Sequence, residues 1–188
     1  NYLHHIYILA VNEMRDDFMF NLHNRQYIFR QSNGKLWNFF CDHRHNLCYS
    51  IMSEKGSWSG AAVLHKNVYQ YFYAEMDEED TFHLMFQTGS GNIHYSRLDG
   101  QSFKTVPVLN SRTPSLYDKK LYIAPLKNNI YLFYVLQHES SYILAYQALG
   151  NSGPGNPKVV DYVSGSSRPC SIIYDHEQNI YVFYQTYD

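Results

Sequence analysis

The stretch Asn179-Ile180-Tyr181-Val182-Phe183-Tyr184 is one of four copies of a short apolar and aromatic pattern. The other copies are Lys35-Leu36-Trp37-Asn38-Phe39-Phe40, Thr81-Phe82-His83-Leu84-Met85-Phe86 and Asn129-Ile130-Tyr131-Leu132-Phe133-Tyr134. Their third residues stand at positions 37, 83, 131 and 181, so successive copies are 46, 48 and 50 residues apart. A regular period of this length indicates a repeat architecture in which each repeat is one supersecondary unit.

Turn residues around the copies favour strands over helices. Asn33-Gly34, Asn128-Asn129 and Gln178-Asn179 stand at the start of three copies, and Gly89-Ser90-Gly91-Asn92 follows the second. Turns this close together leave room for strands only. The copies lack strict alternation, which is typical of strands buried on both faces. We therefore predict that the aromatic residues at repeat positions are buried between sheets: Trp37, Phe39, Phe86, Phe133 and Phe183.

Each copy has further strand-like segments around it. The segment before each copy covers residues 26–30, 70–74, 121–124 and 170–174. A third strand is expected after the first three copies, at 47–50, 93–96 and 143–146, and a fourth at 61–64, 105–109 and 159–163. Four short strands in about 47 residues match one blade of a β-propeller.

The fourth repeat has only two strands, and the N-terminus begins with what resemble the missing ones. Residues 5–11 resemble a third strand and residues 18–22 a fourth. Counting from position 181 to the last residue, 188, and then from residue 1 to 37 gives 44 residues, which is again close to one repeat. We therefore predict an all-β fold and a single domain over residues 1–188. It is a β-propeller of four four-stranded antiparallel blades, the last closed by the N- and C-terminal strands.

Two alternatives remain open at this point. Four blades are the low end of the usual range of about 4 to 8, so the chain is either a closed ring or part of a longer one. Residues 12–24 carry Met14, Phe18 and Leu22 at a spacing of four, which also suits a short amphipathic helix.

The composition limits which partners and which cellular compartment are expected for this protein. The 188 residues include 17% charged side chains and carry a net charge of −2. This balance does not support nucleic-acid binding, which needs a concentrated basic face. No apolar run approaches the roughly 18 to 20 residues that span a bilayer, so we expect no membrane insertion. An odd number of cysteines and no visible signal peptide favour the cytoplasm.

The segment from Cys41 to Cys48 is the densest group of metal-ligand side chains, because His43 and His45 lie between the cysteines. Its spacing matches no standard zinc motif, so we expect a polar hairpin tip and no metal or other cofactor. The two cysteines flank a predicted hairpin, and a disulfide between them remains an alternative. The third cysteine, Cys170, lies in a predicted strand.

Arg112 and Arg168 are the candidate ligand-binding residues. Arg168 stands directly before Pro169, and Arg112 stands two residues before Pro114. Both lie in segments that lead into a blade. Arginines gathered at the mouth of a propeller channel would bind carboxylates or phosphates through two parallel hydrogen bonds. The alternative is a structural role in loops that tie blades together. No catalytic residues can be named.

Three further features are expected to serve structure. His83 and His94 occupy strand positions within the repeat and are expected to pack in the core. The acidic run from Asp77 to Asp80 is expected to be a solvated hairpin tip, because like charges repel one another. Most of the 19 tyrosines fall inside strands, where packing between sheets with the hydroxyl at the rim is their expected role.

The repeated motif, followed by Tyr-Ser and then Gly-x-x-aromatic, resembles the blades of sialidase-like and tachylectin-like propellers. Ser53-Glu54-Lys55-Gly56-Ser57-Trp58 is similar to the sialidase Asp box but lacks its Asp and is two residues shorter. Arg112-Thr113-Pro114 is similar to the Arg-Ile-Pro segment of the same family. The remaining arginines, the tyrosine nucleophile and the carboxylates of a sialidase site have no matching residues, so the resemblance implies a fold and not an activity.

Three functions are compatible with these observations. The leading expectation is a non-catalytic binding or scaffolding propeller with a protein or glycan ligand. A carbohydrate-binding lectin is the alternative, although the polar residues differ between repeats. A sialidase-like glycosidase is the third, and it would need a pair of carboxylates that the sequence does not identify.

Overall fold

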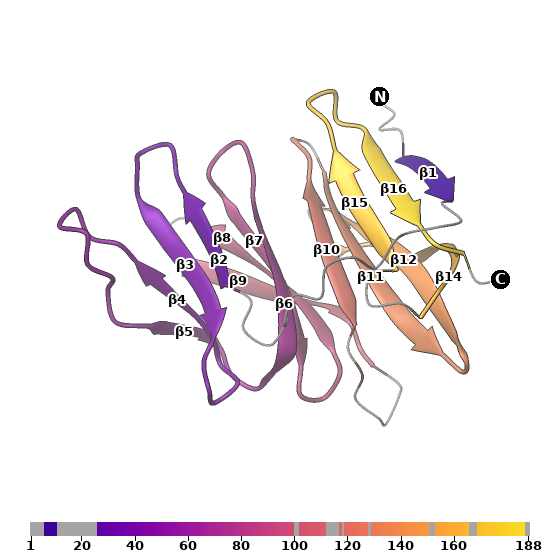
Figure 1. The fold of residues 1–188 in the computed structure, drawn as a ribbon, viewed down its shortest axis with the longest axis horizontal. Coiled ribbons are helices and arrows are strands. Elements are labelled where there is room, and N and C mark those ends of the chain that lie inside the picture. The colour runs from indigo at the N-terminus through magenta and orange to yellow at the C-terminus, as the bar shows by residue number, and fades with distance from the viewer. Residues whose placement is uncertain are drawn as a thin grey trace. The chain divides into compact units, whose positions relative to one another are not determined.

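A computed structural model describes residues 6–10, 26–99, 102–111, 117, 119–127, 129–150, 153–165 and 169–186. These residues form strands and turns and no helix, so the all-β prediction is confirmed (Figure 1). The strands make four sheets. In the described part, no helix is long and apolar enough to cross a membrane.

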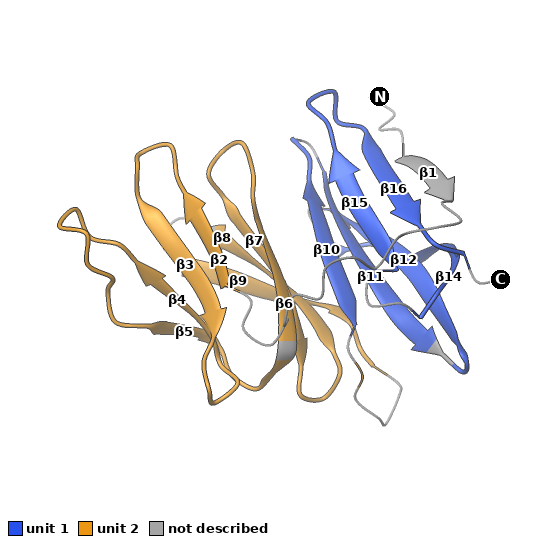
Figure 2. Cartoon of the chain, viewed as in Figure 1, with its two compact units in different colours: residues 1–19, 119–188 blue, residues 20–118 orange. Residues whose placement is uncertain are grey.

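The chain divides into two compact units (Figure 2). One comprises Phe20–Asp118, and the other comprises Lys119–Asp188 together with Asn1–Met19. Each unit contains two sheets. The prediction of a single domain over residues 1–188 stays a prediction.

The first sheet has four antiparallel strands in chain order. They are β2 (Gln26–Arg30), β3 (Leu36–Cys41), β4 (Leu47–Ile51) and β5 (Ala62–His65). The second sheet repeats this order with β6 (Val68–Met76), β7 (Phe82–Thr88), β8 (Ile93–Asp99) and β9 (Ser102–Leu109). All eight strands match the segments expected from the sequence, because tight turns bound each apolar run.

The third sheet contains β10 (Lys120–Pro125), β11 (Ile130–His138), β12 (Ser141–Gly150), the short β13 (Gly153–Pro154) and β14 (Lys158–Val163). Strand β12 is long enough to pair with β13 at its end and with β14 along its first half. The sequence predicts four strands here, and the short β13 is an addition to that pattern.

The fourth sheet departs from the prediction. Strands β15 (Cys170–Tyr174) and β16 (Ile180–Tyr184) are antiparallel as expected. Strand β1 (Ile6–Ala10) also pairs with β16, as the prediction of a shared terminal sheet requires. The pairing is parallel, however, so the predicted antiparallel completion of this blade is wrong. Parallel strands need a long connection, and almost the whole chain separates these two.

The predicted fourth strand of this sheet, at residues 18–22, lies outside the described residues, as does the alternative helix at 12–24. The described part of the sheet therefore has three strands, in the order β1-β16-β15. No sheet is closed among the described strands.

Each unit has its own hydrophobic core between its two sheets. In the unit 20–118, Trp37 and Phe39 of β3 pack against Phe82 of β7, with ring centroids 5.0 and 5.1 Å apart. In the other unit, Phe133 of β11 belongs to the same cluster as Val182 of β16. On each of these strands every second side chain faces the core, because successive side chains of a strand point to opposite faces.

Four of the five aromatic residues predicted to be buried are buried. Trp37 is 7% exposed, and the exposed fraction of Phe39, Phe86 and Phe133 is 0%. Phe183 is only half-buried, although it occupies the same repeat position as Phe39 and Phe133. The prediction of a fully buried side chain is therefore wrong for Phe183.

Replacing Phe133 by alanine is expected to lower the free energy of unfolding by about 3–5 kcal/mol, the cost of emptying a buried Phe site. Tyr162→Ala is the control, because Tyr162 is 54% exposed on β14 of the same sheet. Urea denaturation of both variants measures the difference. A loss below about 1 kcal/mol for Phe133→Ala, far under the range for a buried Phe, would contradict the packing.

The parallel direction of β1 predicts which cysteine pairs form disulfides. Residue 7 lies opposite Tyr181 and residue 9 opposite Phe183. We expect Tyr7→Cys to link with Tyr181→Cys, and Leu9→Cys with Phe183→Cys, in a background without the three native cysteines. An antiparallel strand would instead link Tyr7→Cys with Phe183→Cys. In the parallel sheet these two positions are diagonal neighbours about 8 Å apart, beyond the reach of a disulfide.

Candidate functional site

The predicted ligand-binding arginines, Arg112 and Arg168, lie outside the described residues. Their role therefore stays a prediction. The hairpin turns at the ends of the sheets are the next feature that the repeats share.

Six hairpins share one turn geometry, and they span residues 31–35, 42–46, 53–57, 77–81, 88–92 and 175–179. In each, the backbone N–H of the fourth residue donates to the carbonyl oxygen of the first. The fourth residue has a positive φ, between 58° at His45 and 85° at Gly91. Glycine fills this left-handed position in three of the turns, and His45, Asp80 and Gln178 fill it in the others.

The first residue of the turn also binds the third residue of the following motif. Trp37 Nε1 donates to Gln31 Oε1 at 2.9 Å, and Tyr181 Oη donates to Asp175 Oδ2 at 3.0 Å. In the second repeat His83 Nε2 lies 2.9 Å from Asp77 Oδ2. The third motif position therefore carries an aromatic ring with a polar tip, which packs in the sheet and anchors the turn.

His83 is the centre of a buried polar network. It is 1% exposed, and its Nδ1 lies 2.6 Å from the Tyr95 hydroxyl. Burial raises the pKa of Tyr95. Burial alone would raise the pKa of Asp77 too, but the hydrogen bonds from His83 and from the Thr81 backbone bring it below its ordinary value. His83 packs as expected, and the sequence did not reveal that its two nitrogens are both engaged.

The acidic hairpin tip is more than a solvated run of charge, so that prediction is wrong for two of its residues. The Asp77 carboxylate accepts the Thr81 N–H at 2.8 Å, and the Asp80 carboxylate accepts the Ser32 N–H at 2.9 Å. Gln31 Nε2 donates to the carbonyl oxygen of Asp80 at 3.0 Å. The two bonds that involve Asp80 tie the tip of the second sheet to the turn of the first.

The segment from Cys41 to Cys48 forms a hairpin tip, as predicted. Asp42 Oδ1 accepts the backbone N–H groups of Arg44 and Asn46 at 2.8 and 2.9 Å. Both cysteines are free thiols. Cys41 pairs with Leu47, and Cys48 pairs with Phe40, so their side chains point to opposite faces and cannot form a disulfide.

Burial raises the pKa of Cys41 to about 12 and also raises the pKa of Cys48, so both thiols are protonated near pH 7 in the folded chain. Within the described residues, no three His, Cys, Asp or Glu side chains are placed to hold one ion.

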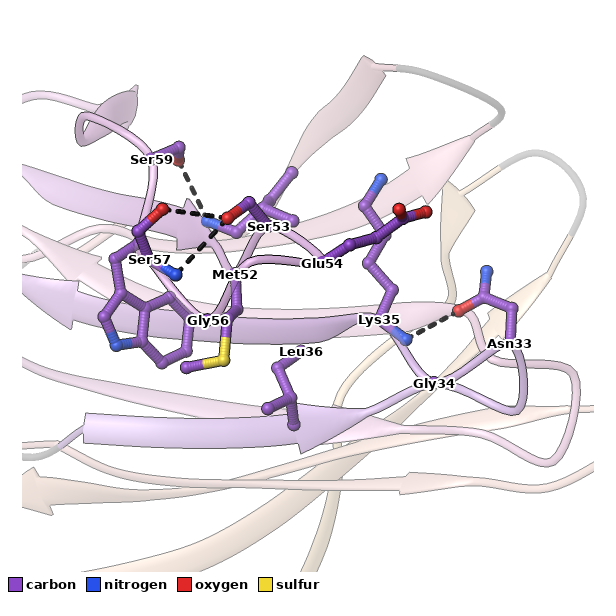
Figure 3. A pocket seen from close by; sticks show the side chains of 12 residues that line it. Asn33, Gly34, Lys35, Leu36, Met52, Ser53, Glu54, Gly56, Ser57 and Ser59 are labelled. Atoms are coloured by element: carbon purple, nitrogen blue, oxygen red, sulfur yellow. Dashed lines mark hydrogen bonds between the residues drawn. The ribbon is translucent and has the colours of Figure 1, made fainter.

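An open groove lies at one end of the first sheet, between the turns 31–35 and 53–57 (Figure 3). Its volume is about 900 Å³. Leu36 and Met52 form its apolar floor, and Lys35 and Glu54 stand at one side. Trp58 lines the groove and is 40% exposed, whereas Trp37 of the same sheet is 7% exposed.

The polar groups of the groove are partly used to hold its own wall. Ser53 Oγ and Ser57 Oγ are 2.8 Å apart, and Ser59 Oγ accepts the Ile51 N–H at 3.0 Å (Figure 3). The Lys35 ammonium lies 5.2 Å from the centre of the Trp37 ring. The indole of Trp58 is the large apolar side chain of the groove lining that is exposed to solvent. In the sequence, Trp58 stands out only as the last residue of the segment similar to an Asp box.

A second cluster of titratable side chains joins the two sheets of this unit. The ring of His94 stacks on Phe86 with centroids 5.7 Å apart, and the ring of His65 lies 5.8 Å from that of His94. His94 Nδ1 is buried and has no hydrogen-bond partner among the described residues. Burial lowers the pKa of His94, and the neighbouring His65 lowers it further. His94 is half-buried, which partly agrees with its predicted packing role.

Searches among protein families and among curated proteins find no match for this chain. Among solved structures, the chain is similar to a mutant of AofleA from Arthrobotrys oligospora in which three arginines are replaced by alanine. The two chains share 15% identity with a TM-score of 0.61, and the match covers 84% of this chain and 48% of the other. The chain thus spans about half the length of that neighbour. This likeness shows a shared fold and leaves the function to the site.

The lowered pKa of His94 predicts that stability falls on acidification. The unfolded chain binds a proton near pH 6.5, whereas folded His94 binds one only at lower pH, so stability is lost as the pH falls through 6.5 toward the folded pKa. Unfolding midpoints measured between about pH 8 and pH 5 should show this loss. His94→Phe keeps the stacking and should flatten the profile, whereas His176→Gln in an exposed turn should not. An unchanged profile in His94→Phe would contradict the assignment.

Proposed function

We propose that the chain is a non-catalytic binding and scaffolding module whose four sheets are blades of a β-propeller. The repeat supports this fold, because three sheets have the strand order of a blade and follow one another at a regular spacing. The likeness to a solved structure over 84% of the chain supports a common architecture.

The exposed groove on the first sheet is the binding surface of this module. The observation that carries the proposal is the exposure of Trp58 over an apolar floor made by Leu36 and Met52. A large indole that stays 40% exposed leaves apolar area in water, and such area typically marks a binding site. Tryptophan is also the residue that most often dominates the energetics of an interface.

A non-catalytic role agrees with where the reactive side chains lie. Asp77, His83 and Tyr95 form a hydrogen-bonded titratable network, and His83 and Tyr95 are 1% and 3% exposed. A substrate cannot reach groups buried this deeply. Their hydrogen bonds hold the hairpin tip, which is a structural use of the same chemistry.

Carbohydrate is the second candidate ligand. The specific observation is an exposed indole beside the hydroxyl groups of Ser53 and Ser57. The apolar face of a sugar ring stacks on an aromatic side chain, and sugar hydroxyls bind side-chain oxygens. Against it stands the engagement of these serine hydroxyls in holding the turn.

The groove is tested by a glycan array and by quenching of tryptophan fluorescence. Trp37→Phe leaves Trp58 as the single tryptophan, since the chain has two. Any ligand or protein that occupies the groove should then shield Trp58 from acrylamide, and Trp58→Ala should weaken binding at least tenfold. Tyr174→Ala is the matched control, because Tyr174 is 38% exposed on the fourth sheet. Equal binding by Trp58→Ala and wild type would show that the groove is not the site.

A further inference from the structure

Two histidines from different sheets of the unit 20–118 lie side by side. His65 is the last residue of β5 in the first sheet, and His94 is the second residue of β8 in the second sheet. Their ring centroids are 5.8 Å apart. Both rings also pack on Phe86 of β7, with centroid distances of 4.6 and 5.7 Å. The pair therefore forms a contact between two strands that do not pair with each other in a sheet.

The hydrogen bond of His65 decides which of its nitrogens carries the proton. Its Nδ1 lies 2.7 Å from the carbonyl oxygen of Lys66. A carbonyl oxygen can only accept, so Nδ1 carries the hydrogen and donates it, and Nε2 of the neutral ring holds a lone pair. Histidines that bind metal ions have this arrangement, because a hydrogen bond from one nitrogen to a backbone carbonyl fixes the tautomer and the ring orientation.

The second histidine has a nitrogen without a use in the described structure. Nδ1 of His94 is buried and has no hydrogen-bond partner among the described residues. A buried polar atom without a partner calls for an explanation, and a bound ion is one of them. Burial lowers the pKa of His94, and the neighbouring His65 lowers it further, so the ring is neutral at pH 7. A neutral imidazole is the form that binds a metal ion.

The spacing of the two rings suits one shared ion. Bonds of about 2.0–2.1 Å from a tetrahedral ion to two imidazole nitrogens place the ring centres about 5–6 Å apart. The observed distance of 5.8 Å between His65 and His94 lies in that range. Both side chains are half-buried, so water can fill the other coordination positions. In the part of the chain that the structure describes, no third His, Cys, Asp or Glu completes the set.

We infer that His65 and His94 bind one divalent transition-metal ion, of the class of Zn²⁺, Ni²⁺ and Cu²⁺, between the first and second sheets. Imidazole nitrogen suits these ions, whereas Mg²⁺ and Ca²⁺ take oxygen ligands. With two protein ligands, the site is weaker than a structural zinc site with four. It lies outside the segment 41–48, whose spacing matches no standard zinc motif.

The consequence of such a site is a link between β5 and β8 that depends on the ion. An ion that binds the folded chain through both histidines does not find the same pair in the unfolded chain. It therefore stabilises the folded state, by an amount that grows with its free concentration. This role is separate from ligand binding in the Trp58 groove, and neither depends on the other.

The site is tested by titrating the chain with zinc chloride at pH 7.5, with magnesium chloride as the control salt. Zn²⁺ should bind at one ion per chain and raise the urea unfolding midpoint, and Mg²⁺ should do neither. His65→Gln and His94→Phe should each weaken zinc binding at least tenfold, and the second keeps a ring that can stack on Phe86. His43→Gln and His176→Gln, in exposed turns of the same chain, should bind zinc as wild type does.

A second measurement needs no variant and so does not depend on how a substitution affects folding. In long-range ¹H–¹⁵N spectra of the wild-type chain, Zn²⁺ should shift the ring nitrogens of both His65 and His94, with His65 bound through Nε2. Loss of zinc binding in both site variants together with these shifts would support the inference. An absence of saturable binding, zinc binding that persists in both site variants, or shifts confined to other histidines would each overturn it.

Discussion

The alternation of side chains along a strand governs this structure, because it makes every sheet two-sided. Aromatic side chains on one face of a sheet meet apolar side chains on the opposite face of the next. In the unit 20–118, the rings of Trp37 and Phe39 lie 5.0 and 5.1 Å from the ring of Phe82. Burial of such side chains supplies most of the favourable free energy of a core, at about 25 cal/mol per Å². A one-residue slip of any strand would exchange its faces and lose both neighbours.

Much of the strand pattern was predictable from the sequence because its cause is local. Tight turns with a glycine at a left-handed position, such as Gly34 and Gly91, fix where a strand ends. The aromatic motif then fixes which strand of each repeat is most buried, and Phe39 and Phe133 follow it. The spacing of the motifs predicted four sheets, and the structure contains four.

The remaining features depend on contacts between distant residues, and the sequence carries little signal for them. The parallel direction of β1 is set by pairing across almost the full chain, and apolar residues alone do not distinguish the two directions. The hydrogen bonds of His83 with Asp77 and Tyr95 join residues whose types also suit a solvated turn. In the sequence, Trp58 appears only within the segment similar to an Asp box, and its 40% exposure in the groove made it a candidate binding residue.

Three of the hairpin turns carry backbone strain that a glycine would avoid. His45, Asp80 and Gln178 adopt φ values of 58°, 61° and 69°, where a side chain costs about 1–2 kcal/mol relative to glycine. The three glycines at the same place in sister turns avoid this cost. The chain therefore tolerates strained backbone where the first turn residue, an aspartate in all three cases, supplies compensating hydrogen bonds. Sequence drift at these tips is limited less by the strained residue itself than by the aspartate three positions before it.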